Sequence, residues 1–186
     1  MVKRPPFRLS VDQYEKMIRH GILTEYHKIE LIHGELVPKM PIGDPHIACV
    51  RQLARLFYLY AMNLATIGIQ DPIRLADSEP EPDISVLAPR KDNYKTGKAT
   101  PPDIYLVVEV ADSSVDYDRE DKGRLYAMNG IAEYWLANVN ESCVEVYRDP
   151  QPDGTYSSTQ KLTPGDSIAL LRLPSVSLSV ADIFGS

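Results

Sequence analysis

The chain has few cysteines, no long apolar run and no basic excess, and each shortage argues against a class of protein. Its two cysteines, Cys49 and Cys143, lie far apart in the sequence. Neither a disulfide framework nor a cysteine-rich zinc site is expected, and we interpret both as buried apolar side chains. The longest apolar runs, such as residues 104–108, are far shorter than the roughly 20 residues of a membrane-spanning helix. Because no signal-peptide core follows the N-terminus, we expect a cytoplasmic protein with no membrane partner.

Acidic residues outnumber basic ones, 26 to 20, which gives a formal net charge of -6. Proteins that hold nucleic acid by neutralising phosphates over a broad surface usually carry a basic excess, so that mode of binding is disfavoured. A site built from carboxylates that bind cations contributes negative charge itself, so a nuclease remains possible. With 186 residues, 44% of them hydrophobic, we expect one domain spanning residues 1–186.

The N-terminal region predicts a helix followed by a β-hairpin. Ser10 and Gln13 have the spacing of a capping box, which predicts a helix over about residues 11–20. Gly34 interrupts an apolar stretch at residues 28–38, and glycine readily adopts the positive φ of a tight turn. This stretch therefore predicts a hairpin.

A long amphipathic helix is predicted from Asp44 to about Leu64. Asp44 has the properties of an N-cap, Pro45 suits the first helical position, and His46 falls in the first turn.

The remainder of the chain predicts a mixed sheet flanked by helices. Strands are expected at residues 69–75, 83–87, 104–110, 133–138, 143–148 and about 167–173. A helix at about 118–129, a turn at 152–154 and a closing turn at 180–184 complete the pattern. The fold class is therefore α/β (α+β), and the almost continuously apolar segment at 104–110 is expected at the centre of the sheet.

Three carboxylates alternate with prolines before the strand at 83–87. The two-residue period of an extended chain places Glu79, Glu81 and Asp83 on one side. Such crowding costs electrostatic free energy unless cations, donors or water relieve it. The run is either a solvated acidic loop or part of a cation-binding site.

Glu109 lies inside an apolar strand, where a carboxylate needs a compensating partner. That partner is either an arginine from a neighbouring element or a metal ion. If Asp83 and Glu109 lie on adjacent strands, the pair suits Mg²⁺ or Mn²⁺, which favour a few carboxylates together with water.

The predicted helix at 118–129 places Asp118, Lys122 and Tyr126 on one face. The Asp-Lys spacing is typical of a surface pair. Because the helix follows the Glu109 strand, its first turns could instead bring an ammonium group to the two carboxylates.

Six segments in this order resemble the bacterial "putative restriction endonuclease" family, which is abundant in cyanobacteria: residues 30–36, 41–46, 82–86 and 102–110, Asp118 with Lys122 and Tyr126, and residues 130–136. The resemblance covers nearly the whole chain. It implies a restriction-endonuclease-like core of the PD-(D/E)XK superfamily, Mg²⁺-dependent hydrolysis of DNA phosphodiester bonds, and frequent dimerisation.

The resemblance assigns metal-binding and catalytic roles to Asp83 and Glu109. Where the nuclease signature has a lysine two residues after the glutamate, this chain has Ala111, so the catalytic ammonium is assigned to Lys122. Asp112 stands where relatives tend to carry serine, and its negative charge would disfavour approach of DNA.

Glu35 and His46 match recurrent family positions and are further candidate catalytic residues, with Glu30 a weaker match. A solvated hairpin glutamate and an ordinary helix-start histidine are the alternatives. A polar loop with four basic residues is predicted to contact the phosphate backbone, or else to be merely solvated: Arg90, Lys91, Lys95 and Lys98.

We therefore predict a homodimeric, Mg²⁺-dependent endodeoxyribonuclease, with Mn²⁺ as a second possible cofactor and DNA as substrate. Lys122 would orient the attacking water and stabilise the transition state, so that Lys122→Met removes cleavage and leaves folding nearly intact. The alternatives are a catalytically silent module that keeps the nuclease fold, and a metal-dependent hydrolase of a small phosphorylated molecule.

Overall fold

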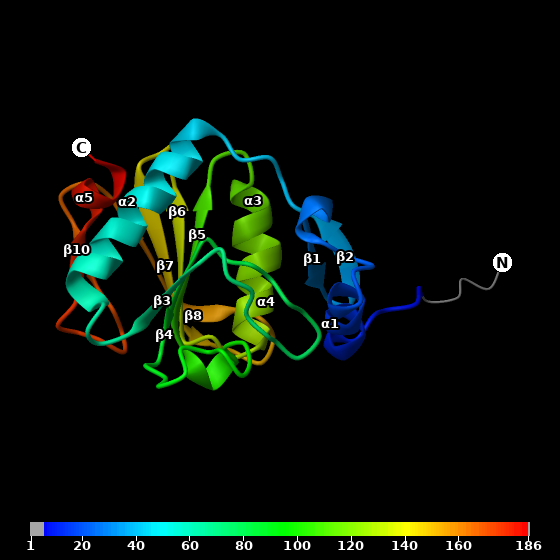
Figure 1. The fold of residues 1–186 in the computed structure, drawn as a ribbon. Helices are drawn as coiled ribbons and strands as arrows, with labels where there is room; N and C mark the ends of the chain where they lie inside the picture. Colours follow the sequence, from blue (N-terminus) through cyan, green and yellow to red (C-terminus); the bar gives the residue numbers. More distant parts are fainter. Residues whose placement is uncertain (1–5, 186) are drawn as a thin grey trace.

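A six-stranded mixed sheet forms the centre of the computed structural model, which describes residues 6–185 (Figure 1). Its strands, in spatial order, are β3 (Thr66–Ile69), β4 (Ile84–Leu87), β5 (Ile104–Ala111), β6 (Glu133–Asn138), β7 (Cys143–Pro150) and β8 (Tyr156–Leu162). Strands β5 and β6 pair in parallel and the other neighbours pair antiparallel. The predicted α/β (α+β) fold with a mixed sheet is confirmed, and β5 lies inside the sheet as expected.

One face of the sheet is covered by α2 (Asp44–Ala61) and α5 (Val180–Phe184), next to the small sheet of β9 (Ser167–Ala169) and β10 (Ser177–Ser179). The core on this side includes Phe57 and Trp135, whose ring centroids lie 6.1 Å apart. Gly43 caps α2, so Asp44 is its first residue and not the predicted N-cap.

The opposite face is covered by α3 (Val115–Tyr117), a π-helical turn η3 (Asp118–Lys122) and α4 (Gly123–Met128), which run on without a break (Figure 1). This is the helix predicted at 118–129, with an earlier start. The amide of Gly123 donates to the carbonyl of Asp118, five residues back, and this bond defines the wider turn. Alternate residues of β5 face the two cores, so Val108 packs towards α2 and Val107 towards α4.

The N-terminal part forms α1 (Val11–Arg19), a short 3-10 turn η1 (Glu25–His27) and the hairpin of β1 (Ile29–Ile32) and β2 (Glu35–Pro38). The capping box of α1 and the positive φ of Gly34 (74°) confirm both predictions. The Gly34 amide donates to the Asp77 carbonyl at 2.9 Å, and the Glu79 amide donates to the Leu31 carbonyl at 2.7 Å. These bonds attach the hairpin to the segment that enters β4.

Two strand predictions need correction, and one strand was missed. The strand expected at 69–75 is wrong, because β3 ends at Ile69 and the Ile73 amide bonds to the Pro80 carbonyl within a loop. The strand expected at 167–173 ends at Ala169, and β8 was not predicted at all. A second 3-10 turn, η2, spans Pro101–Asp103.

Cys49 and Cys143 are buried and free, as predicted. Among the helices of residues 6–185, none is long and apolar enough to cross a membrane.

Candidate active site

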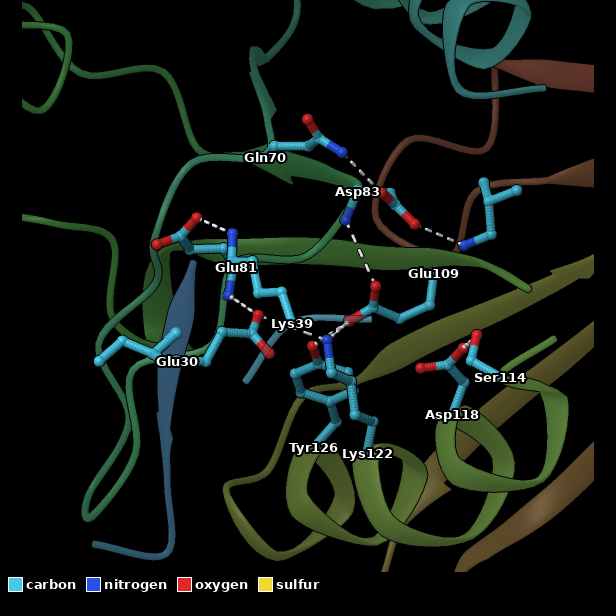
Figure 2. Close-up of polar contacts among 12 residues, drawn as sticks. Glu30, Lys39, Gln70, Glu81, Asp83, Glu109, Ser114, Asp118, Lys122 and Tyr126 are labelled. Atoms are coloured by element: carbon cyan, nitrogen blue, oxygen red, sulfur yellow. Dashed lines mark hydrogen bonds and ion pairs between the residues drawn. The ribbon is translucent and has the colours of Figure 1, made fainter. Parts of the chain in front are cut away.

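A pocket with a volume of about 120 Å³ opens where the hairpin, the start of α2, the end of β5 and the α3–α4 helix meet. Its charged lining is strongly acidic, with six carboxylates, two lysines and one histidine: Glu30, Glu81, Asp83, Glu109, Asp112, Asp118, Lys39, Lys122 and His46. Figure 2 shows most of these side chains directed at one another.

Asp83 precedes β4 and lies beside Glu109 of β5, because the register pairs Ile84 with Val108. Its Oδ2 accepts the Val110 amide at 2.9 Å and lies 2.9 Å from His46 Nε2. Gln70 donates to its Oδ1 at 3.1 Å (Figure 2).

The pKa of Asp83 lies below its ordinary value although burial opposes this shift, because His46, the Val110 amide and Gln70 stabilise the carboxylate. The pKa of His46 is raised by Asp83 against the effect of its own burial. Each group of this pair therefore favours the charged form of the other.

Glu109 is the most deeply placed carboxylate of the pocket, with only 3% of the residue exposed. Its Oε1 accepts from Lys122 Nζ at 2.9 Å and from the Tyr126 hydroxyl at 2.5 Å, and its Oε2 lies 3.4 Å from the Asp83 amide. Burial raises the pKa of Glu109 to about 8, with Lys122 opposing the shift and Asp83 reinforcing it. In this environment Glu109 holds a proton unless cations compensate its charge.

Lys122 is the last residue of the π-helical turn, and only 7% of the residue is exposed. Its ammonium lies 2.9 Å from Glu109 Oε1 and 3.5 Å from Glu30 Oε1. Burial alone would lower the pKa of Lys122. The nearby Glu109 and Glu30 carboxylates raise it by more than burial lowers it, so the pKa lies above its ordinary value. The lysine therefore stays protonated at neutral pH.

Glu30 reaches the pocket from β1. Its Oε1 accepts the Glu81 amide at 2.7 Å as well as facing Lys122, while Glu81 itself is ion-paired with Lys39. The signal in the sequence is the same as for Glu109, a carboxylate within an apolar strand. Glu30 was the weaker family match in the sequence, and the structure places it in the pocket beside Lys122.

Asp118, in the first position of the π-helical turn, lies on the other side of the pocket. Ser114 Oγ donates to Asp118 Oδ2 at 2.5 Å. Burial raises the pKa of Asp118 to about 6, and the bond from Ser114 opposes this shift.

The sequence matches a family described as "Putative restriction endonuclease" (Uma2) over residues 11–181. The chain belongs to this family. Among solved structures, the fold is similar to a crystal structure described as a putative nuclease belonging to DUF820 from Anabaena variabilis. That similarity has a TM-score of 0.73 and 21% identity, and it covers 97% of this chain and 98% of the other, so it shows a shared fold. A comparison with curated proteins found no match.

The family resemblance had assigned Glu35 to the pocket, and the structure places it elsewhere. Its side chain is 54% exposed and pairs with Arg8 at 2.9 Å. Glu35 shares a hairpin face with Val37, which lines the pocket, but it lies two residues closer to the turn. Two residues span about 7 Å along a strand, which keeps Glu35 outside the pocket. Glu30, which is paired with Val37 across the hairpin, lines the pocket in its place.

The four basic residues of the loop after β4 also lie outside the pocket lining. Arg90 is held by both carboxylate oxygens of Asp92 at 2.8 Å, and Lys98 is held by Glu79 at 2.7 Å. Lys91 and Lys95 are exposed. Only these two present their charge freely on the surface, and a contact with DNA through the loop stays a prediction.

The three carboxylates of the acidic run at residues 79–83 do not share one site, although their spacing places them on one side of an extended chain. Glu79 faces Lys98, Glu81 faces Lys39, and Asp83 faces His46. Of the three, Glu81 and Asp83 line the pocket and Glu79 does not.

The pocket offers two adjacent carboxylates as possible ligands of a divalent metal ion. Within the described part of the chain, no group of three or more histidine, cysteine, aspartate or glutamate residues is arranged to hold a metal ion. Two adjacent carboxylates, Asp83 and Glu109, nevertheless provide the hard oxygen ligands of Mg²⁺, which retains several waters when bound. The pocket has more carboxylates than basic side chains, so an added cation would reduce the repulsion among them. The residues therefore fit a mostly hydrated Mg²⁺ ion or Mn²⁺ ion.

Proposed function

We propose that the chain is an endonuclease that hydrolyses DNA phosphodiester bonds with the aid of Mg²⁺. The observation that carries the proposal is the convergence of Asp83, Glu109 and Lys122 from three separate elements on one pocket. The family match and the nuclease-like fold support it.

Asp83 and Glu109 would hold the metal ion. When bound, Mg²⁺ lowers the pKa of a coordinated water and neutralises charge on a phosphate group. Asp83 is kept ionised by His46 and Gln70, so it is ready to bind a cation. Glu109 has one oxygen held by Lys122 and Tyr126, while its Oε2 receives only the long bond from the Asp83 amide.

Lys122 is the candidate for orienting the nucleophile. An ammonium group has three N–H donors, and Glu109 and Glu30 accept two of them. The third remains for an attacking water or a phosphate oxygen. A charge fixed in a buried site stabilises developing negative charge more strongly than it would in water.

His46 and Tyr126 are positioning residues in this proposal. Each holds one oxygen of a metal-binding carboxylate, His46 that of Asp83 and Tyr126 that of Glu109. They would restrict the two carboxylates to one orientation before an ion binds.

The test is a nicking assay on supercoiled plasmid and on single-stranded DNA with Mg²⁺, Mn²⁺ or EDTA. We expect metal-dependent cleavage that Asp83→Asn abolishes and that the matched variant Asp116→Asn retains, because the Asp116 side chain is 91% exposed and outside the pocket. Cleavage that continues in EDTA or in Asp83→Asn would contradict the proposal.

A second candidate, a hydrolase of small phosphodiesters, is favoured by one observation. Two of the four loop cations, Arg90 and Lys98, are engaged within the protein, and none of the four lines the acidic pocket. Hydrolysis of bis(p-nitrophenyl) phosphate without nicking of any DNA would support this function over the first.

A further inference from the structure

The segment that joins β2 to α2 carries two large apolar side chains at the rim of the acidic pocket. Met40 is 58% exposed and Ile42 is 52% exposed, and both line the same pocket as Asp83 and Glu109. Contact of apolar side chains with water costs free energy, so a ligand that covers Met40 and Ile42 would gain binding free energy.

The backbone of this segment is held at both ends. The Lys39 amide donates to the Lys28 carbonyl at 2.7 Å, and Gly43 accepts the Ile47 amide at 3.1 Å as the N-cap of α2. A Cβ at Gly43 would lie 3.0 Å from Asp112 Oδ2, so the chain passes close to the end of β5. Between these anchors, Pro41 restricts φ. The side chains of residues 40 and 42 therefore project from a constrained backbone.

The segment is poorly suited to bind phosphate. Its one cation, Lys39, is ion-paired with Glu81, and the neighbouring Asp112 is acidic. In a nucleic acid the surfaces that match exposed methionine and isoleucine side chains are the faces of the bases. Apolar side chains of this kind enter DNA by inserting between base steps and unstacking them.

We propose that Met40 and Ile42 contact the faces of nucleobases next to the scissile phosphate and act as an apolar wedge that selects locally unstacked DNA. The inference rests on the proposed nuclease function and adds to it the part of the substrate that this rim recognises. In this proposal the cations of the pocket bind the phosphate, and residues 40–42 contact the bases.

The experiment compares two double variants of the full chain. Met40→Ala/Ile42→Ala removes the proposed wedge, and Leu59→Ala/Met62→Ala removes two apolar side chains of similar exposure (61% and 60%) outside the pocket. Binding is measured by fluorescence anisotropy with Ca²⁺ in place of Mg²⁺, on labelled duplexes with and without a central mismatch. A 2-aminopurine base next to the mismatch reports unstacking.

We expect the wedge variant to bind mismatched DNA about 10- to 30-fold more weakly than the wild type, since each side chain has roughly half of its surface left to bury. The dependence of binding on salt should stay unchanged, because no phosphate contact is lost. The rise in 2-aminopurine fluorescence should disappear in this variant and persist in the Leu59/Met62 control. The conservative variant Met40→Leu/Ile42→Val should bind as the wild type does.

Several results would overturn the inference. If the wild type nicks DNA and the wedge variant binds mismatched DNA as tightly as the wild type does, the inference is wrong and the nuclease proposal stands. If the wild type neither binds nor cleaves any DNA, both are wrong. A wedge variant that loses self-association in sedimentation, with unchanged DNA binding per chain, would show that the segment contacts a second copy of the protein.

Discussion

Replacing Lys122 by methionine tests whether one buried ammonium neutralises the carboxylates of the pocket. Methionine nearly matches the length of the lysine side chain, so the change removes charge with little loss of packing. In the variant, Glu109 and Glu30 face each other without the ammonium that lies 2.9 and 3.5 Å from them.

The expected loss of stability follows from the burial of this pair. The side chains of Lys122 and Glu109 are 8% and 5% exposed, and removing one partner of a buried ion pair typically costs about 3–5 kcal/mol. At pH 7 and without a metal ion, Glu109 is already mostly protonated, because its pKa is about 8, so the loss of the ammonium leaves less uncompensated charge than in a fully ionised pair. We therefore expect a loss near the lower limit, about 3 kcal/mol, which lowers the Tm of a chain of this length by roughly 6–12 °C.

This value revises the sequence-based expectation that Lys122→Met leaves folding nearly intact. The helical spacing of Asp118 and Lys122 is compatible with a surface pair, and only the tertiary structure shows that the ammonium is buried.

The assay is urea unfolding at pH 7 in EDTA, followed by circular dichroism. Lys161→Met is the matched control, because Lys161 forms an exposed pair with Glu141 and should lose less than about 1 kcal/mol. The double variant Glu109→Gln/Lys122→Met should be more stable than Lys122→Met alone, since it removes both charges. Nicking is then measured well below the Tm of each variant. If Lys122→Met is as stable as Lys161→Met, the reasoning about charge is refuted, and if it nicks at the wild-type rate, so is the proposed catalytic role.

Three further predictions concern the same site and the assembly. Glu30→Gln should lower kcat for nicking about 10-fold with little change in KM, because it removes one charge beside Lys122 but keeps an oxygen that can accept from Lys122 and from the Glu81 amide. A change in KM alone would contradict this role. In EDTA the free energy of unfolding should fall by on the order of a few kcal/mol between about pH 4 and pH 8. The sign follows from the raised pKa values of Asp118 (about 6) and Glu109 (about 8), since the folded protein retains protons that the unfolded chain has already released. Urea titrations across this pH range, with and without Mg²⁺, check this trend. Mg²⁺ should make the free energy of unfolding depend less on pH, and a free energy of unfolding that rises with pH in EDTA would contradict the prediction. Cleavage of both strands of a duplex by one site per chain is easiest with two-fold symmetry, so light scattering should give twice the mass of one chain, and a single-chain mass at micromolar concentrations would contradict a homodimer.

The parts of the fold that sequence predicted are those with local causes. Ser10 and Gln13 form their capping box within one turn, and Gly34 forms its turn whatever surrounds it. Strand β8 was missed because Tyr156–Leu162 is mostly polar and becomes a strand through its ladder with β7. In the segment at 70–75 only Ile73 and Leu75 are apolar, Pro72 has no amide proton for a strand ladder, and the Ile73 amide finds a loop partner.

The candidate site shows the same division. Glu109 could be found because a carboxylate inside an apolar strand needs a partner, and Lys122 because the signature lysine is replaced by Ala111. The choice between Glu30 and Glu35 depends on how the hairpin docks against residues 77–79, which is a tertiary property. The π-helical turn that ends at Lys122 has no local signature in this sequence, and it adds a residue to the turn just before the ammonium enters the pocket.

The charges around Glu109 link the stability of the fold to its proposed chemistry. Six carboxylates and two lysines line one small pocket, and burial raises the pKa of Glu109 to about 8, so the folded protein without a divalent ion favours the protonated form of this residue. A metal ion at Asp83 and Glu109 would take over that neutralisation and release the proton of Glu109. Lys122 contributes in both states, because Glu30 and Glu109 together keep it charged. The same ammonium that compensates the carboxylate cluster in the folded protein therefore lies beside the residues that we propose to bind the metal ion.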